Sequence, residues 1–122
     1  MILAEIMQAA GIRAFVGKLS MDISSRKTYV EDSADQSLDA AKSFIGEVRS
    51  CFAHLPKERQ LIEPVLTPRF VPTCSDKLLS GLGSLSEIEN ARLQSHLAEA
   101  RDQVDWVETE RGMSDIDVFD SV

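Results

Sequence analysis

The sequence predicts an α/β fold in which about three parallel strands alternate with flanking helices. Apolar segments suited to strands lie at 12–21, 61–66 and 91–97, and the segments between them suit helices. Strands that alternate with helices pair in parallel through right-handed crossovers. Eight such units close a (β/α)8 barrel of about 250 residues. We therefore expect the 122 residues to form an arc of about three strands, a partial TIM barrel, as one domain over 1–122.

The helices are expected from apolar spacing and capping residues. In the most regular segment, 37–52, apolar residues recur every three or four positions, which predicts one buried stripe. Gly11 follows an apolar segment at a position suited to a left-handed cap, and Ser75 and Asp76 suit a helix start. The expected helices lie at 2–10, 37–52, 75–82, 99–110 and 116–122.

Glycine and proline residues predict where this regular pattern changes. Gly17, inside the first predicted strand, indicates a close approach of two backbone segments. Pro64 is expected to interrupt the second strand, and Gly81 and Gly83 are expected to weaken the end of their helix. The polar segment 20–37 is too long for a simple connector, so it is either a functional loop or a flexible insertion.

Composition disfavours several classes of partner. Thirteen basic residues against twenty acidic ones give a net charge of -7, which opposes attraction to nucleic acid or anionic lipid. The apolar segments are shorter than a membrane span, and the first residues do not form a signal sequence. We therefore expect a cytoplasmic protein. Cys51 and Cys74 lack metal-site or redox spacing, and we expect both to be reduced apolar fillers.

An imidazole and a carboxylate follow the third predicted strand. His96 and Glu99 lie where α/β sheets place reactive groups, and they suit a metal ligand and a proton carrier for an activated water. A purely structural alternative also fits. In it, His96 packs at the strand end and Glu99 favours the positive start of the next helix.

A guanidinium and an aromatic ring follow the second predicted strand. Arg69 could donate two hydrogen bonds to a carbonyl-bearing ligand, while Phe70 stacks on its flat face. The alternative is a surface arginine with Phe70 packed beneath it. His54 is expected to be solvated or capping, and Trp106 is expected to belong to the core.

Three motifs together resemble a known enzyme family. They are RAFVGK at 13–18, TPRF at 67–70 and QSHLAE at 94–99. In this order and spacing they resemble the guanine deaminases of the amidohydrolase superfamily, the fungal type most of all, over nearly the whole chain. The resemblance implies a zinc-dependent hydrolase of purine catabolism that converts guanine to xanthine and ammonia.

The same resemblance implies a role for each candidate residue. His96 would be a zinc ligand at the end of a barrel strand. Glu99 would carry a proton between the metal-bound water and the purine. Arg69 would grip the purine, and Phe70 would form part of the sandwich around it.

The chain also departs from the family pattern. It contains no His-x-His pair, which in the family supplies two zinc ligands, and one histidine does not hold zinc alone. Ala98 and Ala100 replace residues that are commonly polar in the family. We therefore expect the isolated chain to be inactive.

Two other interpretations stay open at this stage. The chain could be a non-catalytic half-barrel that associates with itself or with a complementary chain through open sheet edges. It could also derive from another amidohydrolase that acts on a different aminated heterocycle.

Overall fold

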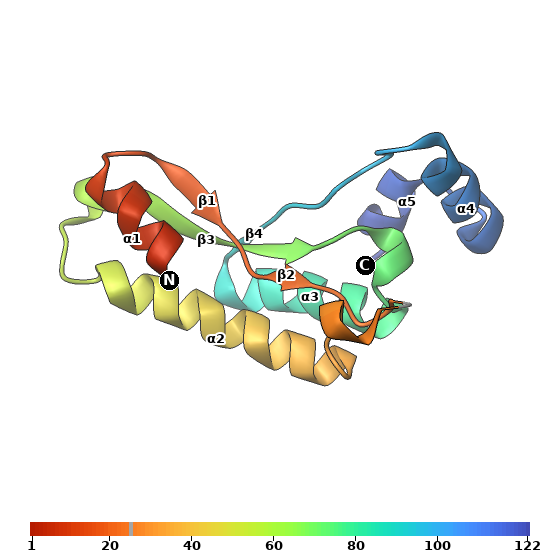
Figure 1. Cartoon of the computed structure of the whole chain (residues 1–122), viewed down its shortest axis with the longest axis horizontal. Helices are drawn as coiled ribbons and strands as arrows, with labels where there is room; N and C mark the ends of the chain where they lie inside the picture. Colours follow the sequence, from red (N-terminus) through yellow and green to blue (C-terminus); the bar gives the residue numbers. More distant parts are fainter. Residues whose placement is uncertain (25) are drawn as a thin grey trace.

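The computed structural model describes residues 1–24 and 26–122 as helices packed on a small parallel sheet (Figure 1). Short 3-10 turns lie at Lys27–Tyr29, Lys57–Arg59 and Val71–Thr73. The longer elements, in chain order, are α1 (Ile2–Ala9), β1 (Ala14–Val16), β2 (Leu19–Ser20), α2 (Ala34–Phe52), β3 (Ile62–Pro68), α3 (Asp76–Glu89), β4 (Arg92–Leu93), α4 (Arg101–Arg111) and α5 (Asp115–Asp120).

Strand β3 lies in the middle of the sheet and pairs in parallel on both of its edges. Ala14 of β1 lies opposite Ile62, and Leu19 of β2 lies opposite Thr67. Both pairs are 48 positions apart (62 - 14 and 67 - 19), so β1 and β2 form one interrupted strand. On the other edge, Val65 lies opposite Arg92 of β4. The predicted α/β fold with about three parallel strands is confirmed.

The interruption between β1 and β2 lies at Gly17, where the two backbones come close. A β-carbon at this position would overlap the Thr67 side chain and would lie 2.6 Å from the carbonyl oxygen of Val65. Glycine is therefore required sterically, as predicted for a strand glycine beside a neighbouring backbone.

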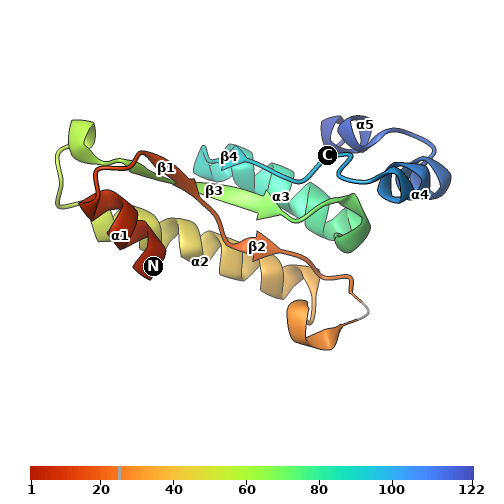
Figure 2. The ribbon, with the colours of Figure 1, turned by 45° about the horizontal axis from the view of Figure 1, so that its top comes forward.

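Helices α2 and α3 lie on one face of the sheet (Figure 2). Strand side chains alternate between faces, and the even-numbered residues Val16, Ile62 and Leu66 pack into the cores formed with these helices. The odd-numbered residues of β1 and β3 line the opposite face, together with Arg92 of β4, which lies opposite Val65. There the Arg92 guanidinium lies 5.4 Å from the centre of the Phe15 ring.

The third predicted strand is much shorter than expected. Only Arg92–Leu93 of the predicted 91–97 segment is strand. Gln94 N donates to Leu66 O at 2.9 Å, after which the chain leaves the ladder. Residues 95–97 run past the end of β3 as a loop. The predicted strand therefore included loop residues at its carboxyl end.

The expected interruption at Pro64 is wrong, because β3 runs unbroken through it. Leu66 O accepts from the β4 side, so the even-numbered residues of β3 turn their polar backbone groups toward β4. Pairing with β4 starts only at Val65. The missing N–H of Pro64 therefore precedes the start of that ladder and costs no strand hydrogen bond.

The expected weakening of α3 by its glycines is also wrong. The helix continues through both to Glu89 and ends at Asn90, which is left-handed with φ of 47°. A β-carbon at Gly81 would come within 2.5 Å of the Leu38 side chain. The absence of a side chain at Gly81 therefore lets α2 and α3 pack closely.

Within the described part of the chain, no helix is both long and apolar enough to cross a membrane.

We predict that Gly17→Ala lowers the free energy of unfolding by about 2 kcal/mol or more, because the added methyl has no room beside Thr67 and Val65. The matched control is Gly46→Ala, in α2, where a β-carbon meets nothing within 4 Å. That control should raise stability by up to about 1 kcal/mol. Urea unfolding of the three proteins measures both effects. Equal stabilities for the two variants would contradict the close approach at Gly17.

Candidate active site at the carboxyl end of the sheet

The backbone carbonyl of Arg69 joins the loops that follow β3 and β4. It accepts from the backbone N–H of His96 at 3.0 Å and lies 2.8 Å from the Nδ1 atom of the same residue. Ser95 Oγ donates to it at 3.2 Å. Two of the residues proposed from sequence, Arg69 and His96, are thus brought together by one oxygen atom.

This contact selects one tautomer of His96. A carbonyl oxygen only accepts, so Nδ1 must carry the hydrogen of the contact. In the neutral ring the lone pair then lies on Nε2. An imidazole oriented by a backbone carbonyl in this way has the usual arrangement of a metal-binding histidine. His96 as a residue is solvent-exposed.

The side chain of Arg69 lies over its neighbour. Its guanidinium carbon is 5.0 Å from the centre of the Phe70 ring, a cation–π distance worth about 0.5–1 kcal/mol at an exposed site. Arg69 is exposed and Phe70 is half-buried. The pair presents a planar charged group and an aromatic surface side by side at the end of β3.

A pocket of about 340 Å³ lies beside this pair, between the end of β3 and α4. Phe70 and Glu99 both contribute to its wall, whereas Arg69 and His96 do not. The complete lining consists of Phe70, Pro72, Glu99, Ala100, Asp102, Gln103 and Trp106. All four candidate residues therefore lie along one rim, but the structure does not gather them in a single cavity.

The chain turns sharply between His96 and Glu99. Ala98 has φ of 47°, in the left-handed region that a residue with a β-carbon adopts at a cost of about 1–2 kcal/mol. Backbone in such a conformation is often found at functional sites. Here the turn brings Glu99 back to the pocket at the start of α4.

The floor of the pocket was not foreseen from the sequence. Gln103 Nε2 donates to Asp115 Oδ1 at 2.8 Å, and both side chains are buried. Gln103 Oε1 accepts from the backbone N–H of Glu99 at 3.2 Å. One amide thus fixes both Glu99 and α5, and no sequence pattern pairs these distant residues. The prediction that Trp106 belongs to the core is wrong, because the residue is 41% exposed and lines the pocket.

The loop after β2 is tied to the same rim. The carbonyl oxygen of Ser20 accepts from Arg69 N at 3.0 Å and from Cys74 Sγ at 3.5 Å. Asp22 accepts from Ser75, through the backbone N–H at 2.8 Å and the hydroxyl at 2.5 Å. Ser75 in turn caps α3. These contacts fix the backbone on both sides of the Arg69 and Phe70 pair.

Both cysteines are free, and Cys74 is fully buried. Burial raises the pKa of the Cys74 thiol to about 11, so this thiol stays protonated near neutral pH. It acts as an apolar filler with one weak hydrogen bond, as predicted from sequence. Cys51 is half-buried on α2.

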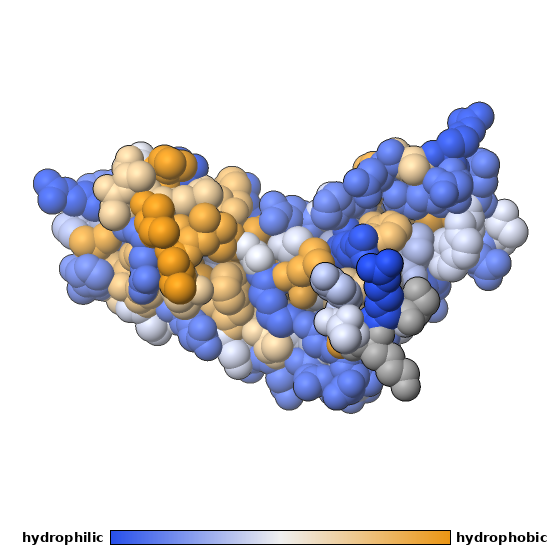
Figure 3. Space-filling model, in the orientation of Figure 1, coloured by the Kyte–Doolittle hydropathy of each residue, from blue (hydrophilic) through white to orange (hydrophobic). Residues whose placement is uncertain are grey.

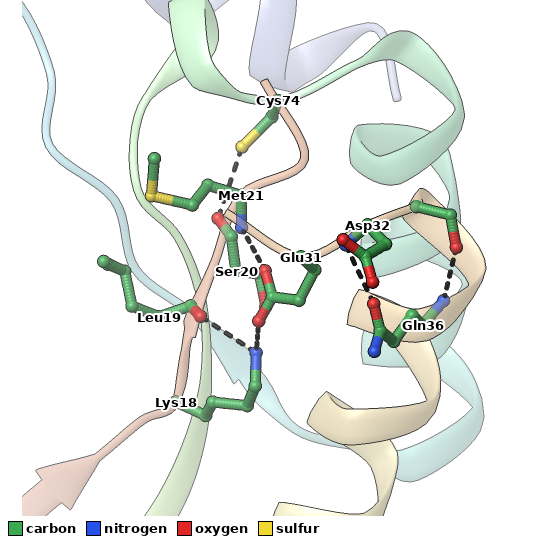
Figure 4. Close-up of polar contacts among 9 residues, drawn as sticks. Lys18, Leu19, Ser20, Met21, Glu31, Asp32, Gln36 and Cys74 are labelled. Atoms are coloured by element: carbon green, nitrogen blue, oxygen red, sulfur yellow. Dashed lines mark hydrogen bonds and ion pairs between the residues drawn. The ribbon is translucent and has the colours of Figure 1, made fainter. Parts of the chain in front are cut away.

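An ion pair fastens the segment that precedes α2 (Figure 4). The Glu31 carboxylate pairs with Lys18 and accepts from Met21 N at 3.1 Å, while Lys18 Nζ also donates to Leu19 O at 3.0 Å. Burial favours the neutral carboxyl, but the hydrogen bonds from Lys18 and Met21 and the charge of Lys18 outweigh it. They hold the pKa of Glu31 below its ordinary value of 4.5.

The described residues do not by themselves make a metal site. Among them, no group of three or more His, Cys, Asp or Glu side chains lies close enough to hold a metal ion. His96 suits one coordination position, whereas zinc needs at least three protein ligands in a catalytic site. His54, the other histidine, is exposed after the end of α2.

Two curated relatives match most of the chain. Guanine deaminase of Dictyostelium discoideum is 41% identical over 108 residues, which cover 88% of this chain and 22% of the relative. The probable guanine deaminase of Schizosaccharomyces pombe is 39% identical over 106 residues, which cover 87% and 19% respectively. The chain therefore spans about a fifth of the length of these relatives. No protein-family model matches the chain.

Solved structures contain the same fold. Guanine deaminase from C. acetobutylicum, solved with bound guanine in its active site, superposes with a TM-score of 0.82 at 30% identity, over 98% of this chain and 27% of that one. Atrazine chlorohydrolase from Arthrobacter aurescens, solved with zinc, superposes with a TM-score of 0.76 at 20% identity over 96% and 26%. The latter shows the fold alone.

The parallel sheet, its one helical face and its open edges define an arc of an amidohydrolase-type TIM barrel, as these superpositions show. More narrowly, the chain is homologous to about a fifth of the length of guanine deaminases. The family assignment made from the three motifs is confirmed.

We predict that Glu31→Gln lowers the free energy of unfolding by about 1 kcal/mol at pH 7, because the variant keeps hydrogen-bonding atoms but loses the charge facing Lys18. The pKa of Glu31 is depressed in the folded chain, so its stabilising effect is present above about pH 4.5 and is lost as the pH falls through the folded-state value. Urea unfolding at pH 7 and pH 3 measures this difference.

The control for this prediction is Glu63→Gln, because Glu63 pairs with Arg92 at 3.2 Å while both side chains are about half exposed or more. We expect a smaller effect there. An effect of Glu31→Gln that is the same at both pH values would show that the carboxylate charge does not stabilise the fold.

Proposed function

We propose that the chain is a segment of a guanine deaminase that hydrolyses guanine to xanthine and ammonia, and that the isolated segment is inactive. The homology and the superposition support the reaction class. The observation that carries the site assignment is the contact of His96 Nδ1 with Arg69 O. It unites a ligand-type imidazole with the end of the strand that supplies Arg69 and Phe70.

Arg69 and Phe70 are assigned to purine binding. A guanidinium offers donors in a rigid planar fork, which suits the carbonyl oxygen of guanine. An aromatic ring offers a face for stacking. Their 5.0 Å contact keeps the charged plane and the ring adjacent, so one flat ligand can meet both.

Glu99 is assigned to proton transfer. Its position in the wall of the same pocket as Phe70 supports this role, because a purine stacked on Phe70 would lie near the carboxylate. There it would take a proton from the attacking water and deliver it to the departing nitrogen. The backbone contact with Gln103 holds the start of α4, and therefore Glu99, in place.

His96 is assigned as a metal ligand through Nε2. Zinc, when bound, would supply an activated water for the hydrolysis. The described residues provide one suitable imidazole and no group of three ligands, so the metal site requires residues from outside this chain. We infer the inactivity of the isolated segment from this shortage.

A second candidate function is a non-catalytic role through association. It is favoured by the open sheet, in which β1 and β2 at one side and β4 at the other pair only with β3 among the described strands. Unpaired strand edges bind further strands readily. This alternative and the deaminase assignment agree that the arc requires a partner surface.

A chimaeric enzyme tests the assignments. The matched segment of the Dictyostelium guanine deaminase is replaced by the corresponding residues of this chain, and release of xanthine from guanine is measured. We expect activity in the chimaera. We expect kcat to fall by about a hundredfold or more for Glu99→Gln and for His96→Ala, and KM to rise by about tenfold or more for Arg69→Ala.

Matched controls use residues of the same type outside the rim. His54→Ala and Glu108→Gln change an exposed histidine and an exposed carboxylate and should leave kcat and KM within about twofold. An active chimaera in which Glu99→Gln or His96→Ala behaves like these controls would refute the corresponding role. The isolated chain, incubated with guanine and zinc, should yield no xanthine, and turnover there would refute the inferred incompleteness.

A further inference from the structure

The pocket between the end of β3 and α4 combines an apolar wall with two carboxylates. Phe70 and Pro72 come from the segment after β3, and Trp106 comes from α4. Glu99 and Asp102 supply the acidic groups. The apolar wall is a local feature, because the visible surface over α4 and α5 is mostly hydrophilic (Figure 3). We call this cavity of about 340 Å³ the α4 pocket.

Trp106 is held at the pocket without belonging to the core. It is 41% exposed, whereas the next residue, Val107, is fully buried. Val107 lies in the same core cluster as Val118 of α5. One turn before Trp106, the buried Gln103 donates to Asp115. These contacts fix α4, so the indole forms a wall whose position is set by the helix.

The α4 pocket lies beside the proposed purine site and is not filled by it. Arg69 and His96 lie on the rim but do not line the pocket. A purine that is held by Arg69 and stacked on Phe70 would therefore reach only the edge of the pocket. Glu99 belongs to the pocket wall, and the proposed function makes it the proton donor to the departing nitrogen. That nitrogen, with any group attached to it, would then be directed toward the pocket.

The pocket offers more room than guanine requires on that nitrogen. Guanine releases ammonia, a molecule of about the size of water, which takes about 30 Å³ in the liquid. A pocket of about 340 Å³ can hold several further carbon atoms, and contact of these carbons with the apolar wall would strengthen binding. Helix α4 carries four acidic and two basic residues, and this negative charge favours release of an amine as its ammonium ion.

We propose that the α4 pocket accepts an alkyl group on the departing nitrogen, with Trp106 as the residue that determines this specificity. The substrates are guanines alkylated on the exocyclic amine, and the proposal rests on the deaminase function proposed above. The oxygen of water bonds to the ring carbon that bears the amine, and the bond from that carbon to nitrogen breaks. Its electron pair stays on nitrogen, which receives one proton of the water through Glu99, and the other hydrogen of the water remains with the xanthine. The products are xanthine and an alkylamine, without oxidation or reduction.

The chimaeric enzyme described above tests this activity. It is given guanine, or guanine with an ethyl group on the exocyclic amine, and the release of xanthine and ethylamine is measured. We expect kcat/KM for the ethylated substrate to lie within about tenfold of that for guanine. Trp106→Ala should lower kcat/KM for the ethylated substrate by about tenfold or more and that for guanine by less than about twofold. Trp106→Phe should restore most of the loss, because it keeps an aromatic wall.

The matched control is Val104→Ala, which shortens a half-buried apolar residue of the same helix outside the pocket lining. It should leave the ratio of the two kcat/KM values within about twofold. A Trp106→Ala variant that loses both activities equally would show a purely structural role and overturn the proposal. A chimaera that hydrolyses guanine but not the ethylated substrate would overturn the proposal and leave the deaminase function standing. A chimaera that hydrolyses neither would refute the function, and this activity with it.

Binding to the isolated chain gives a readout that needs no catalysis. Trp106 is the only tryptophan of the sequence, so the tryptophan fluorescence of the 122-residue chain reports on the pocket directly. We expect both compounds to change this fluorescence, and the ethylated guanine to reach half-saturation at a concentration lower by about fivefold or more. An unchanged fluorescence, or equal half-saturation for the two compounds, would overturn the assignment of the α4 pocket to the alkyl group.

Discussion

The parallel pairing of β3 on both edges is the constraint on which the rest of the structure depends. It aligns β1 and β2 with one edge and β4 with the other, so that the chain leaves each strand at the same end of the sheet. Helices α2 and α3 cover one face and bury the even-numbered residues of β3. Without this alignment, residues far apart in sequence would have no common rim.

At that rim a single backbone oxygen links two of the candidate residues, Arg69 and His96. The carbonyl of Arg69 receives three contacts from Ser95 and His96, while the N–H of the same residue donates to Ser20 O. One peptide segment is therefore bound both to the end of β2 and to the loop after β4. The orientation of the His96 ring follows from backbone geometry and needs no neighbouring carboxylate.

The elements that could be predicted from sequence are those with a local physical signal. The stripe from 37 to 52, the cap at Ser75 and the close approach at Gly17 all depend on residues near one another in sequence or on steric size. The predictions were wrong where contacts between segments distant in sequence determine the structure. Pro64 is tolerated because β4 begins only opposite Val65, and Gly81 lies where Leu38 of α2 leaves no room for a side chain. The link between Gln103 and Asp115 has no local signature, and neither has the exposure of Trp106 in the wall of the pocket.

This chain matches one arc of an amidohydrolase-type barrel, and we propose that its rim binds a ligand and a metal. The central claim is that Arg69 O holds His96 with hydrogen on Nδ1 and a free lone pair on Nε2. Long-range proton–nitrogen NMR of the labelled chain above pH 7 reports the tautomer of each histidine directly. We expect His96 to show a protonated Nδ1 and an unprotonated Nε2, and a His96 ring protonated mainly on Nε2 would contradict the account.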